Sequence, residues 1–162
     1  ENDPEKGLEF DGRVTEDFKL DSGTWVSVGT LRAQAVGATS PMLQDCVVCG
    51  QDKPFVGLLA WPNIPAAKEI AGDPSLSGPP AIVAHPKVRA FVQEKLAEHN
   101  KANPGSSSRI KRVILMTEPP SIDGNEITDK GYVNQRATME RRHELVDKLY
   151  VNPVPVDVIE IP

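Results

Sequence analysis

Lys130 is the residue whose type and position are best suited to chemistry, because turn-forming residues surround it. Asp123-Gly124-Asn125 precedes it as a strong turn, since Gly and Asn tolerate the positive φ that a reversal demands. Gly131 breaks the chain again, and helix-forming sequence begins near Val133. A lysine at the tip of such a loop can enter a partner site as a mobile point charge, or it can be an ordinary solvated lysine. The local pattern leaves both interpretations open.

Cys46 and Cys49 have the Cys-x-x-Cys spacing that occurs in redox and zinc sites. The intervening Val47-Val48 reads as β-strand, and an odd separation puts the two thiols on opposite faces of a strand. There is no second cysteine pair, and the histidines are scattered at positions 85, 99 and 143. We therefore expect buried, reduced, structural cysteines and no metal site, as in a cytoplasmic protein.

A small basic cluster, Arg109, Lys111 and Arg112, surrounds the start of a predicted strand at 110–116. Closely spaced cations suit a phosphate group. An exposed strand edge would carry the same residues, so this cluster also has two interpretations.

The elements that must position these residues follow from periodicity and turn signals. Strands are expected at 8–12, 17–20, 24–28, 42–49, 54–61 and 110–116, with a hairpin turn at 50–53. Helices are expected from an N-cap at Thr30 to about Val36 or Ala38, over 86–100 and over 133–150. Residues 62–84 read as an insertion with a short helix at 66–71, and the Pro-rich tail after Tyr150 as loosely attached. The pattern predicts an α+β fold, with a small, mostly antiparallel sheet packed against two or three helices.

Composition places the chain among globular proteins. The 162 residues are 39% hydrophobic and 25% charged, as expected for one domain with its own core. A net charge of −5 argues against a nucleic-acid or anionic-membrane surface. No apolar run reaches the roughly 20 residues of a membrane span. The chain does not start with Met, so we expect a piece of a longer protein.

Two motifs resemble those of adenylate-forming enzymes, the superfamily of acyl-CoA synthetases, peptide-synthetase adenylation domains and firefly luciferase. Thr128-Asp129-Lys130 before an arginine-rich helix resembles the C-terminal lysine motif, with Asp129 in place of the usual Gly and Tyr132 where an acidic residue is common. Residues 10–23 resemble the hinge motif, which runs from Gly-Arg to a Gly-containing turn. The segments 24–32 and 126–137 are most similar to bacterial feruloyl-CoA synthetases.

The resemblance implies roles in adenylation. Lys130 matches the lysine that assists attack of a carboxylate on the α-phosphate of ATP, and Arg13 matches an arginine that contacts the nucleotide ribose. Arg13 could instead pair with a neighbouring carboxylate on the surface. Thr15 takes the hinge position, where Asp or Lys is usual.

The resemblance also implies roles in thioester formation. Lys19 matches a lysine that faces the active site after the domain has rotated, although an exposed sheet lysine would look the same. Gly23, Thr24 and Trp25 match the loop that approaches the pantetheine tunnel of CoA, and Trp25 could instead be core. Arg109 and Lys111 fall where relatives hold the CoA phosphates.

Together these matches imply that residues 1–162 form the C-terminal domain of an ATP-dependent carboxylate–CoA ligase acting on ferulate or a related aryl acid. ATP and CoA are the expected cosubstrates, with Mg²⁺ accompanying ATP. The partner is a large N-terminal domain of the same polypeptide, which would hold the phosphate-binding loop and the acid pocket, so the fragment alone should be inactive. The alternatives are a fatty-acyl-CoA synthetase of the same family and a non-catalytic, stand-alone binding domain.

Overall fold

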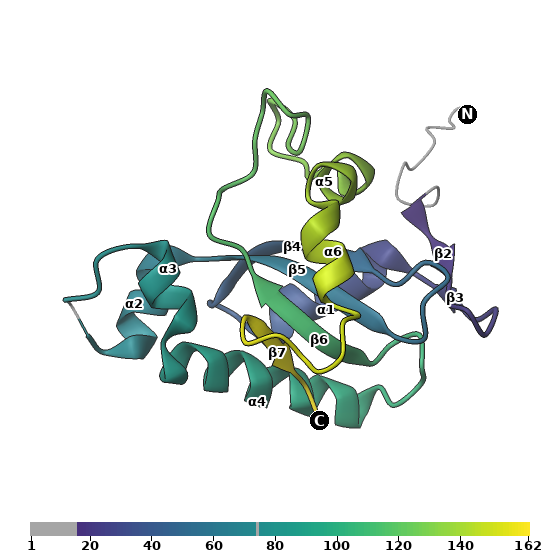
Figure 1. Cartoon of the computed structure of the whole chain (residues 1–162), viewed down its shortest axis with the longest axis horizontal. Coiled ribbons are helices and arrows are strands. Elements are labelled where there is room, and N and C mark those ends of the chain that lie inside the picture. The colour runs from purple at the N-terminus through teal and green to yellow at the C-terminus, as the bar shows by residue number, and fades with distance from the viewer. Residues whose placement is uncertain (1–15, 74) are drawn as a thin grey trace.

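The computed structural model describes residues 16–73 and 75–162, and its centre is a four-stranded sheet (Figure 1). The strands β4 (Leu43–Cys49), β5 (Val56–Pro62), β6 (Ile110–Leu115) and β7 (Val158–Glu160) lie in that order across the sheet. The β4–β5 and β6–β7 pairs are antiparallel, while β5 and β6 are parallel. The predicted α+β fold is confirmed, with a mixed sheet in which antiparallel pairs predominate.

Helices cover both faces of this sheet. On one face, α1 (Val28–Ala38), α2 (Ile64–Ala71), α3 (Pro79–Ala84) and α4 (Pro86–Ala102) enclose the larger apolar cluster. On the other face, α5 (Gln135–Arg141) and α6 (His143–Lys148) cover a smaller cluster that contains Leu59, Ile114 and Leu149. Because β5 is buried along its whole length, its sequence is continuously apolar and not alternating.

The strands and the long helix predicted in the middle of the chain are confirmed. A turn at 50–53 joins β4 to β5, closed by the Lys53 N–H on the Gly50 carbonyl at 2.9 Å. Gly50, at φ 152°, lies against Phe18 and the Phe55 carbonyl, where a Cβ would be crowded. The stripe Val88, Val92 and Leu96 of α4 is fully buried.

Three boundaries differ from the sequence prediction. Helix α1 begins at Val28, because the Asp17 carboxylate accepts the Val28 N–H at 2.9 Å, so Thr30 lies inside the helix. The insertion holds two helices, α2 and α3, where one was expected. The single helix expected over 133–150 is divided into α5 and α6 at Arg142, whose φ of −110° and ψ of 33° leave the helical region.

The C-terminal tail is not loosely attached, and this prediction was wrong. Residues 158–160 form β7, which pairs with β6 in the register Ile114↔Val158 and Arg112↔Glu160. Val158, Ile159 and Ile161 are buried. The strand is only three residues long and lies among three prolines, so the sequence pattern of the tail does not predict it.

A small separate hairpin lies beside the main sheet near the N-terminal end of the described chain (Figure 1). Its strands β2 (Phe18–Lys19) and β3 (Trp25–Val26) pair Phe18 with Val26 and Lys19 with Trp25. The hairpin confirms the expected strands around 17–28, shortened by the early start of α1. The strand expected at 8–12 lies outside the described residues, as do Arg13 and Thr15.

Candidate active site

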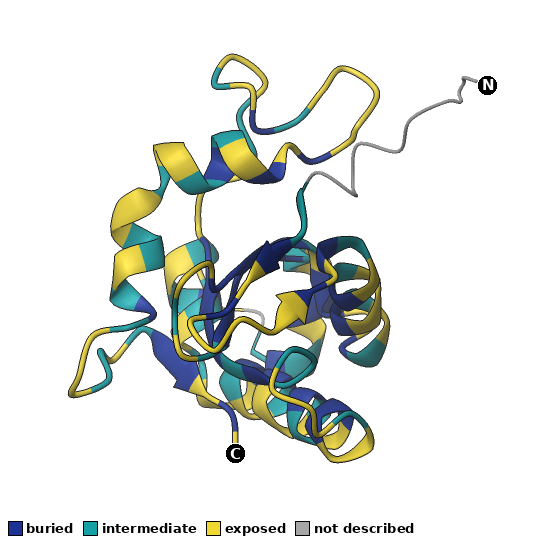
Figure 2. Cartoon of the chain, turned by 90° about the vertical axis from the view of Figure 1, so that its right-hand side faces the viewer, coloured by how far each residue is buried: buried dark blue, intermediate teal, exposed yellow. Residues whose placement is uncertain are grey.

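Lys130 sits at the tip of a tight finger formed by residues 127–133. Ile127 and Val133 form an antiparallel bridge, and the Thr128 N–H donates to the Tyr132 carbonyl at 2.9 Å. Gly131 takes a φ of 87°, which a residue with a Cβ rarely adopts. Residues 128–132 are all exposed, and Figure 2 shows exposed loops projecting beyond α5. The predicted turn-bounded loop is confirmed; the role of its lysine stays a prediction.

Helix α5 closes the finger on its C-terminal side. Asn134 is the N-cap, and its side chain accepts the Ala137 N–H at 3.1 Å. The turn at 123–125 precedes the finger as predicted, with Asn125 in the left-handed region at φ 62°. A Cβ at Gly124 would collide with the guanidinium end of the Arg141 side chain, which is half-exposed and would have to move.

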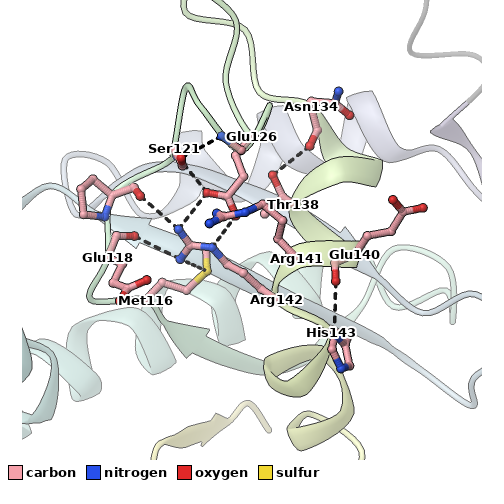
Figure 3. A network of polar contacts seen from close by, with 12 residues as sticks. Met116, Glu118, Ser121, Glu126, Asn134, Thr138, Glu140, Arg141, Arg142 and His143 are labelled. Carbon is pink, nitrogen blue, oxygen red and sulfur yellow. Dashed lines mark hydrogen bonds and ion pairs between the residues drawn. The ribbon is translucent and has the colours of Figure 1, made fainter.

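Glu126 forms the buried base of the finger (Figure 3). Its side chain has a relative exposure of 0%. Arg142 donates to it from Nε at 2.7 Å and from Nη2 at 2.9 Å. The Arg141 guanidinium lies 3.1 Å away, and the Ser121 N–H donates to the carboxylate at 2.9 Å. Burial by itself would raise the pKa of this carboxyl, but the hydrogen bonds from Arg142 and Ser121 outweigh burial and lower the pKa below its ordinary value.

Arg142 joins the finger to the preceding loop and to the sheet. Beyond Glu126 it donates to the Glu118 carbonyl at 3.1 Å, to the Pro119 carbonyl at 3.0 Å and to the Met116 sulfur at 3.2 Å. Its guanidinium also lies 5.6 Å from the centroid of the Trp61 ring. A single side chain at the α5–α6 junction therefore fixes the segment that leads from β6 to the finger.

Gln135 anchors the other leg of the finger. Its Oε1 accepts the Val48 N–H at 2.9 Å, and its Nε2 donates to the Val48 carbonyl at 2.6 Å. Among the described strands β4 lies at the edge of the sheet, so there these backbone groups have no strand partner on that side, and the buried Gln135 amide takes the place of a neighbouring strand. The start of α5 is thereby fixed to the central sheet.

Lys19 and Trp25 share one end of a cleft with the base of the finger. The cleft has a volume of about 830 Å³, and its walls include Lys19, Trp25, Thr128 and Arg136. The Lys19 ammonium lies 5.1 Å from the centroid of the Trp25 ring. Trp25 is 61% exposed, so the interpretation of this residue as core is wrong. In Figure 1 the loops before α5 rise above the sheet, and the hairpin lies at the right-hand side of the molecule.

Gly23 and Thr24 form the turn of this hairpin. The Gly23 N–H donates to the Leu20 carbonyl at 2.9 Å, and Gly23 has a φ of 87°. The hydroxyls of Ser22 and Thr24 lie 3.0 Å apart on the exposed turn. The expected turn before Trp25 is therefore present.

The three basic residues at the start of β6 differ in their burial and their contacts. Arg112 is buried, donates to the carbonyls of Leu149 and Val151 at 2.9 and 3.1 Å, and lies 3.6 Å from Glu160. It therefore holds the C-terminal segment, and its side chain is not part of an exposed basic cluster. Arg109 and Lys111 are half-buried and line no part of the cleft beside Lys19. A second cavity, of about 400 Å³, lies between α3, β6 and α6 and contains none of the predicted site residues.

Cys46 and Cys49 are both buried and free, as predicted. They belong to different apolar clusters, on opposite faces of the sheet. Burial raises the pKa of Cys49 to about 12 and raises the pKa of Cys46 further, so neither forms a reactive thiolate near neutral pH. Within 16–73 and 75–162, no group of three or more His, Cys, Asp or Glu residues could hold a metal ion.

Sequence reasoning missed Glu126, Gln135 and Arg142. In the sequence, Glu126 simply follows the turn at 123–125, and Gln135 and Arg142 are two positions on the helix expected over 133–150. Their partners are distant along the chain, since Gln135 bonds Val48 and Arg142 bonds Glu118. The sequence signal that could have found the Glu126–Arg142 pair is the presence of two adjacent arginines, Arg141 and Arg142, on the helix that follows Glu126.

A small α+β domain that displays a lysine on a finger is the class of protein that this fold and site define. The model of the AMP-binding enzyme C-terminal domain family matches residues 29–153. The chain therefore belongs to this family of C-terminal domains of AMP-binding, adenylate-forming enzymes. A search of curated proteins finds no match.

Solved structures with the same fold are adenylation domains of carboxylic acid reductases. The A domain from Segniliparus rugosus, in complex with AMP and a co-purified carboxylic acid, is 21% identical at a TM-score of 0.64, over 85% of this chain and 20% of its own. The A domain from Mycobacterium chelonae is 22% identical at a TM-score of 0.65, again over 85% and 20%. This chain thus spans about one fifth of the length of these structures. No helix in the described part of the chain is long and apolar enough to cross a membrane.

Proposed function

We propose that this chain is the C-terminal domain of an ATP-dependent carboxylate–CoA ligase that acts on ferulate or a related aryl acid. The observation that carries the proposal is the exposed Lys130 at the tip of a finger whose two legs are fixed to the body. Membership of the AMP-binding C-terminal domain family supports the adenylate-forming chemistry. The resemblance of segments 24–32 and 126–137 supports the aryl acid and the CoA thiol.

In the first step, a carboxylate oxygen attacks the α-phosphorus of ATP, the bond from that phosphorus to the pyrophosphate oxygen breaks, and an acyl-adenylate forms. Negative groups must approach one another in this step. The Lys130 ammonium would lie against the carboxylate and the α-phosphate oxygens, where it aligns the attack and offsets the charge. The exposed tip of the finger, residues 128–132, is suited to this use, because nothing in residues 16–73 and 75–162 covers it. Arg13 would contact the ribose.

In the second step, the thiol sulfur of CoA attacks the acyl carbon, the bond from that carbon to the AMP oxygen breaks, and the thiol loses its proton. Lys19, with Gly23, Thr24 and Trp25, would face the reacting groups after the domain has rotated about Thr15. Lys19 and Trp25 lie together on an exposed hairpin, which fits a surface that meets a substrate in only one orientation. Arg109 and Lys111 would contact the CoA phosphates.

The proposal requires a larger N-terminal domain in the same polypeptide. That domain would hold ATP, with its Mg²⁺, and the carboxylic acid, while the present domain would bring Lys130 or Lys19 to them in turn. The fractions of the solved structures that this chain covers are in keeping with such a division.

The experiment that tests this function uses the full-length protein that contains the domain. Acid-dependent release of pyrophosphate and formation of thioester are measured with ferulate, other aryl acids and saturated fatty acids, each with CoA. We expect turnover with an aryl acid, ATP and CoA. Preference for a fatty acid would favour the fatty-acyl ligase instead. Adenylation without transfer to CoA, but with transfer to a carrier-protein thiol, would contradict the CoA ligase, and no adenylation with any acid would favour a non-catalytic binding domain.

A further inference from the structure

The exposed part of the lysine finger has little of its own to fix its direction. Residues 128–132 are exposed, and the hydrogen bonds among them, such as the Tyr132 N–H to the Thr128 hydroxyl at 3.0 Å, stay within the finger. In the described part of the chain, Lys130 has no ion pair or hydrogen bond from its ammonium. The direction of the finger, and with it the region that this ammonium can reach, is therefore set by the two places where the finger joins the body.

The N-terminal leg is fixed by a buried ion pair between Glu126 and Arg142. The Glu126 carboxylate is fully buried, four residues before Lys130, and Arg142 binds both of its oxygens. The Asn134 N–H donates to the Glu126 carbonyl at 2.8 Å, so the same residue also holds the far strand of the finger. A bidentate arginine–carboxylate pair has a defined geometry, unlike a single hydrogen bond between flexible side chains.

The C-terminal leg is fixed independently. Gln135, five residues after Lys130, makes two hydrogen bonds with the backbone of Val48 in β4. Val48 belongs to the larger buried apolar cluster, so this contact ties the finger to the core of the domain. The two anchors use different chemistry and different partners, and both act on a segment of only ten residues, 126–135.

Resting on the function proposed above, we propose that Glu126, Arg142 and Gln135 are positioning residues for Lys130, which set the place of its ammonium during adenylation. They touch no substrate themselves. If either anchor is lost, the finger keeps its lysine but holds it less accurately, and misplacement of a catalytic group by about 1 Å can cost about 10²-fold in rate. In the second half-reaction, Lys19 and the hairpin around Trp25 would face the substrate, so its rate does not depend on the placement of Lys130.

The test measures both half-reactions separately in the full-length enzyme. Glu126→Gln keeps the shape of the side chain and removes its charge, and Gln135→Met keeps its length and removes both hydrogen bonds. Each variant should lose about 10²-fold in acid-dependent pyrophosphate release. Thioester formation from supplied acyl-adenylate should stay close to that of the wild type. In a Lys130→Ala background, neither variant should cause a further loss, because both act through that lysine.

Arg112→Met is the matched control. Arg112 is also a buried arginine with hydrogen bonds to carbonyls and an acidic partner, but it holds the C-terminal segment and not the finger. We expect this variant to lower the melting temperature at least as much as Glu126→Gln does, and to leave the ratio of the two half-reactions unchanged. A shift of that ratio in the control would show that general loss of stability produces the effect, and would overturn the inference.

Two further outcomes separate the inference from the function on which it rests. If Lys130→Ala slows adenylation but Glu126→Gln and Gln135→Met do not, or if their losses add to that of Lys130→Ala, the positioning role is wrong and the proposed function stands. If Lys130→Ala retains the wild-type adenylation rate, the proposed role of the lysine is wrong and the inference falls with it. Should Glu126→Gln fail to fold, Glu126→Asp, which keeps the charge on a shorter side chain, and Gln135→Met carry the same test.

Discussion

At the scale of single residues, the buried Glu126 is the feature that most clearly links structure to chemistry. A carboxylate removed from water is costly unless charged partners and hydrogen bonds compensate for it. Here Arg142, Arg141 and the Ser121 N–H supply that compensation. The charge is therefore retained in the folded state, and the domain becomes sensitive to any change that leaves one partner alone.

The first prediction concerns the stability of the chain with Glu126→Gln. The change leaves Arg142 without its anion in a largely buried position, and breaking such a pair costs about 3 kcal/mol in the free energy of unfolding. Urea denaturation of the wild-type and variant chains near neutral pH measures this difference. A loss below about 0.5 kcal/mol, typical of an exposed substitution, would contradict the buried pair.

The pH dependence of the same difference follows from the lowered pKa of Glu126. A carboxyl whose pKa is lower in the folded state contributes stability that is fully present above its unfolded pKa of about 4.3. That contribution is lost as the pH falls through the folded pKa, since protonated Glu126 then resembles glutamine. The difference between wild type and Glu126→Gln should thus be constant at neutral pH and narrow in acid. A difference that grows on acidification would have the wrong sign.

At the scale of elements, the small sheet depends on its last strand. β7 covers the edge of β6, and Val158 and Ile159 of this strand are buried, as is Ile161 directly after it. The prolines of the tail give its sequence an irregular appearance. Local composition misleads here, because pairing with a strand more than 40 residues away decides the structure.

A matched pair of substitutions tests this element. Ile161 is 2% exposed and Val156 is 91% exposed, although both lie in the same tail. Ile161→Ala should lower the free energy of unfolding by about 2–5 kcal/mol, whereas Val156→Ala should change it by no more than about 0.5 kcal/mol. Thermal or urea denaturation of the two variants gives the comparison. Equal, small effects would mean that the tail does not belong to the core.

The sequence was sufficient to predict elements whose signals are local. The long helix expected over 86–100, the turn at 50–53 and the glycine beside Lys130 depend on near neighbours, and the structure contains each of them. The start of α1 and its division from β3 could not be predicted, because Asp17 caps that helix from eleven residues away. The same holds for the site. Lys130 could be predicted from its neighbours in the sequence, whereas the roles of Glu126 and Gln135 depend on partners that only the fold brings next to them.

A second prediction at this scale concerns the hinge, which lies outside the described residues and rests on the resemblance alone. If two orientations of the domain serve the two half-reactions, a few residues must absorb the rotation. In the full-length enzyme, Thr15→Pro would fix φ near −65° and remove a backbone donor. One half-reaction should then be severely slowed while the other, which we expect to be adenylation, stays near normal. Two half-reactions that remain equally fast would place the hinge elsewhere.

At the scale of the whole molecule, the domain combines a complete core with an incomplete site. Both faces of the sheet are covered, yet Lys130, Lys19 and Trp25 all point to solvent. Such side chains can complete a site only against another surface, which in our proposal is the large N-terminal domain.

The 162-residue chain alone should therefore fold but catalyse nothing. Its circular dichroism should show a cooperative thermal transition, because it buries its own apolar clusters. Acid-dependent exchange of pyrophosphate into ATP should be undetectable. Measurable exchange by this chain alone would contradict the division of labour between two domains.

The most direct test of the central claim is the rate of each half-reaction in the full-length enzyme carrying Lys130→Ala. Removal of one charge-stabilising group should lower acid-dependent pyrophosphate release by about 10²–10³-fold. Thioester formation from supplied acyl-adenylate should be little changed, as should the melting temperature, because the exposed Lys130 buries little surface. A variant whose two half-reactions fall equally, or whose adenylation rate matches the wild type, would contradict the assignment of Lys130 to adenylation.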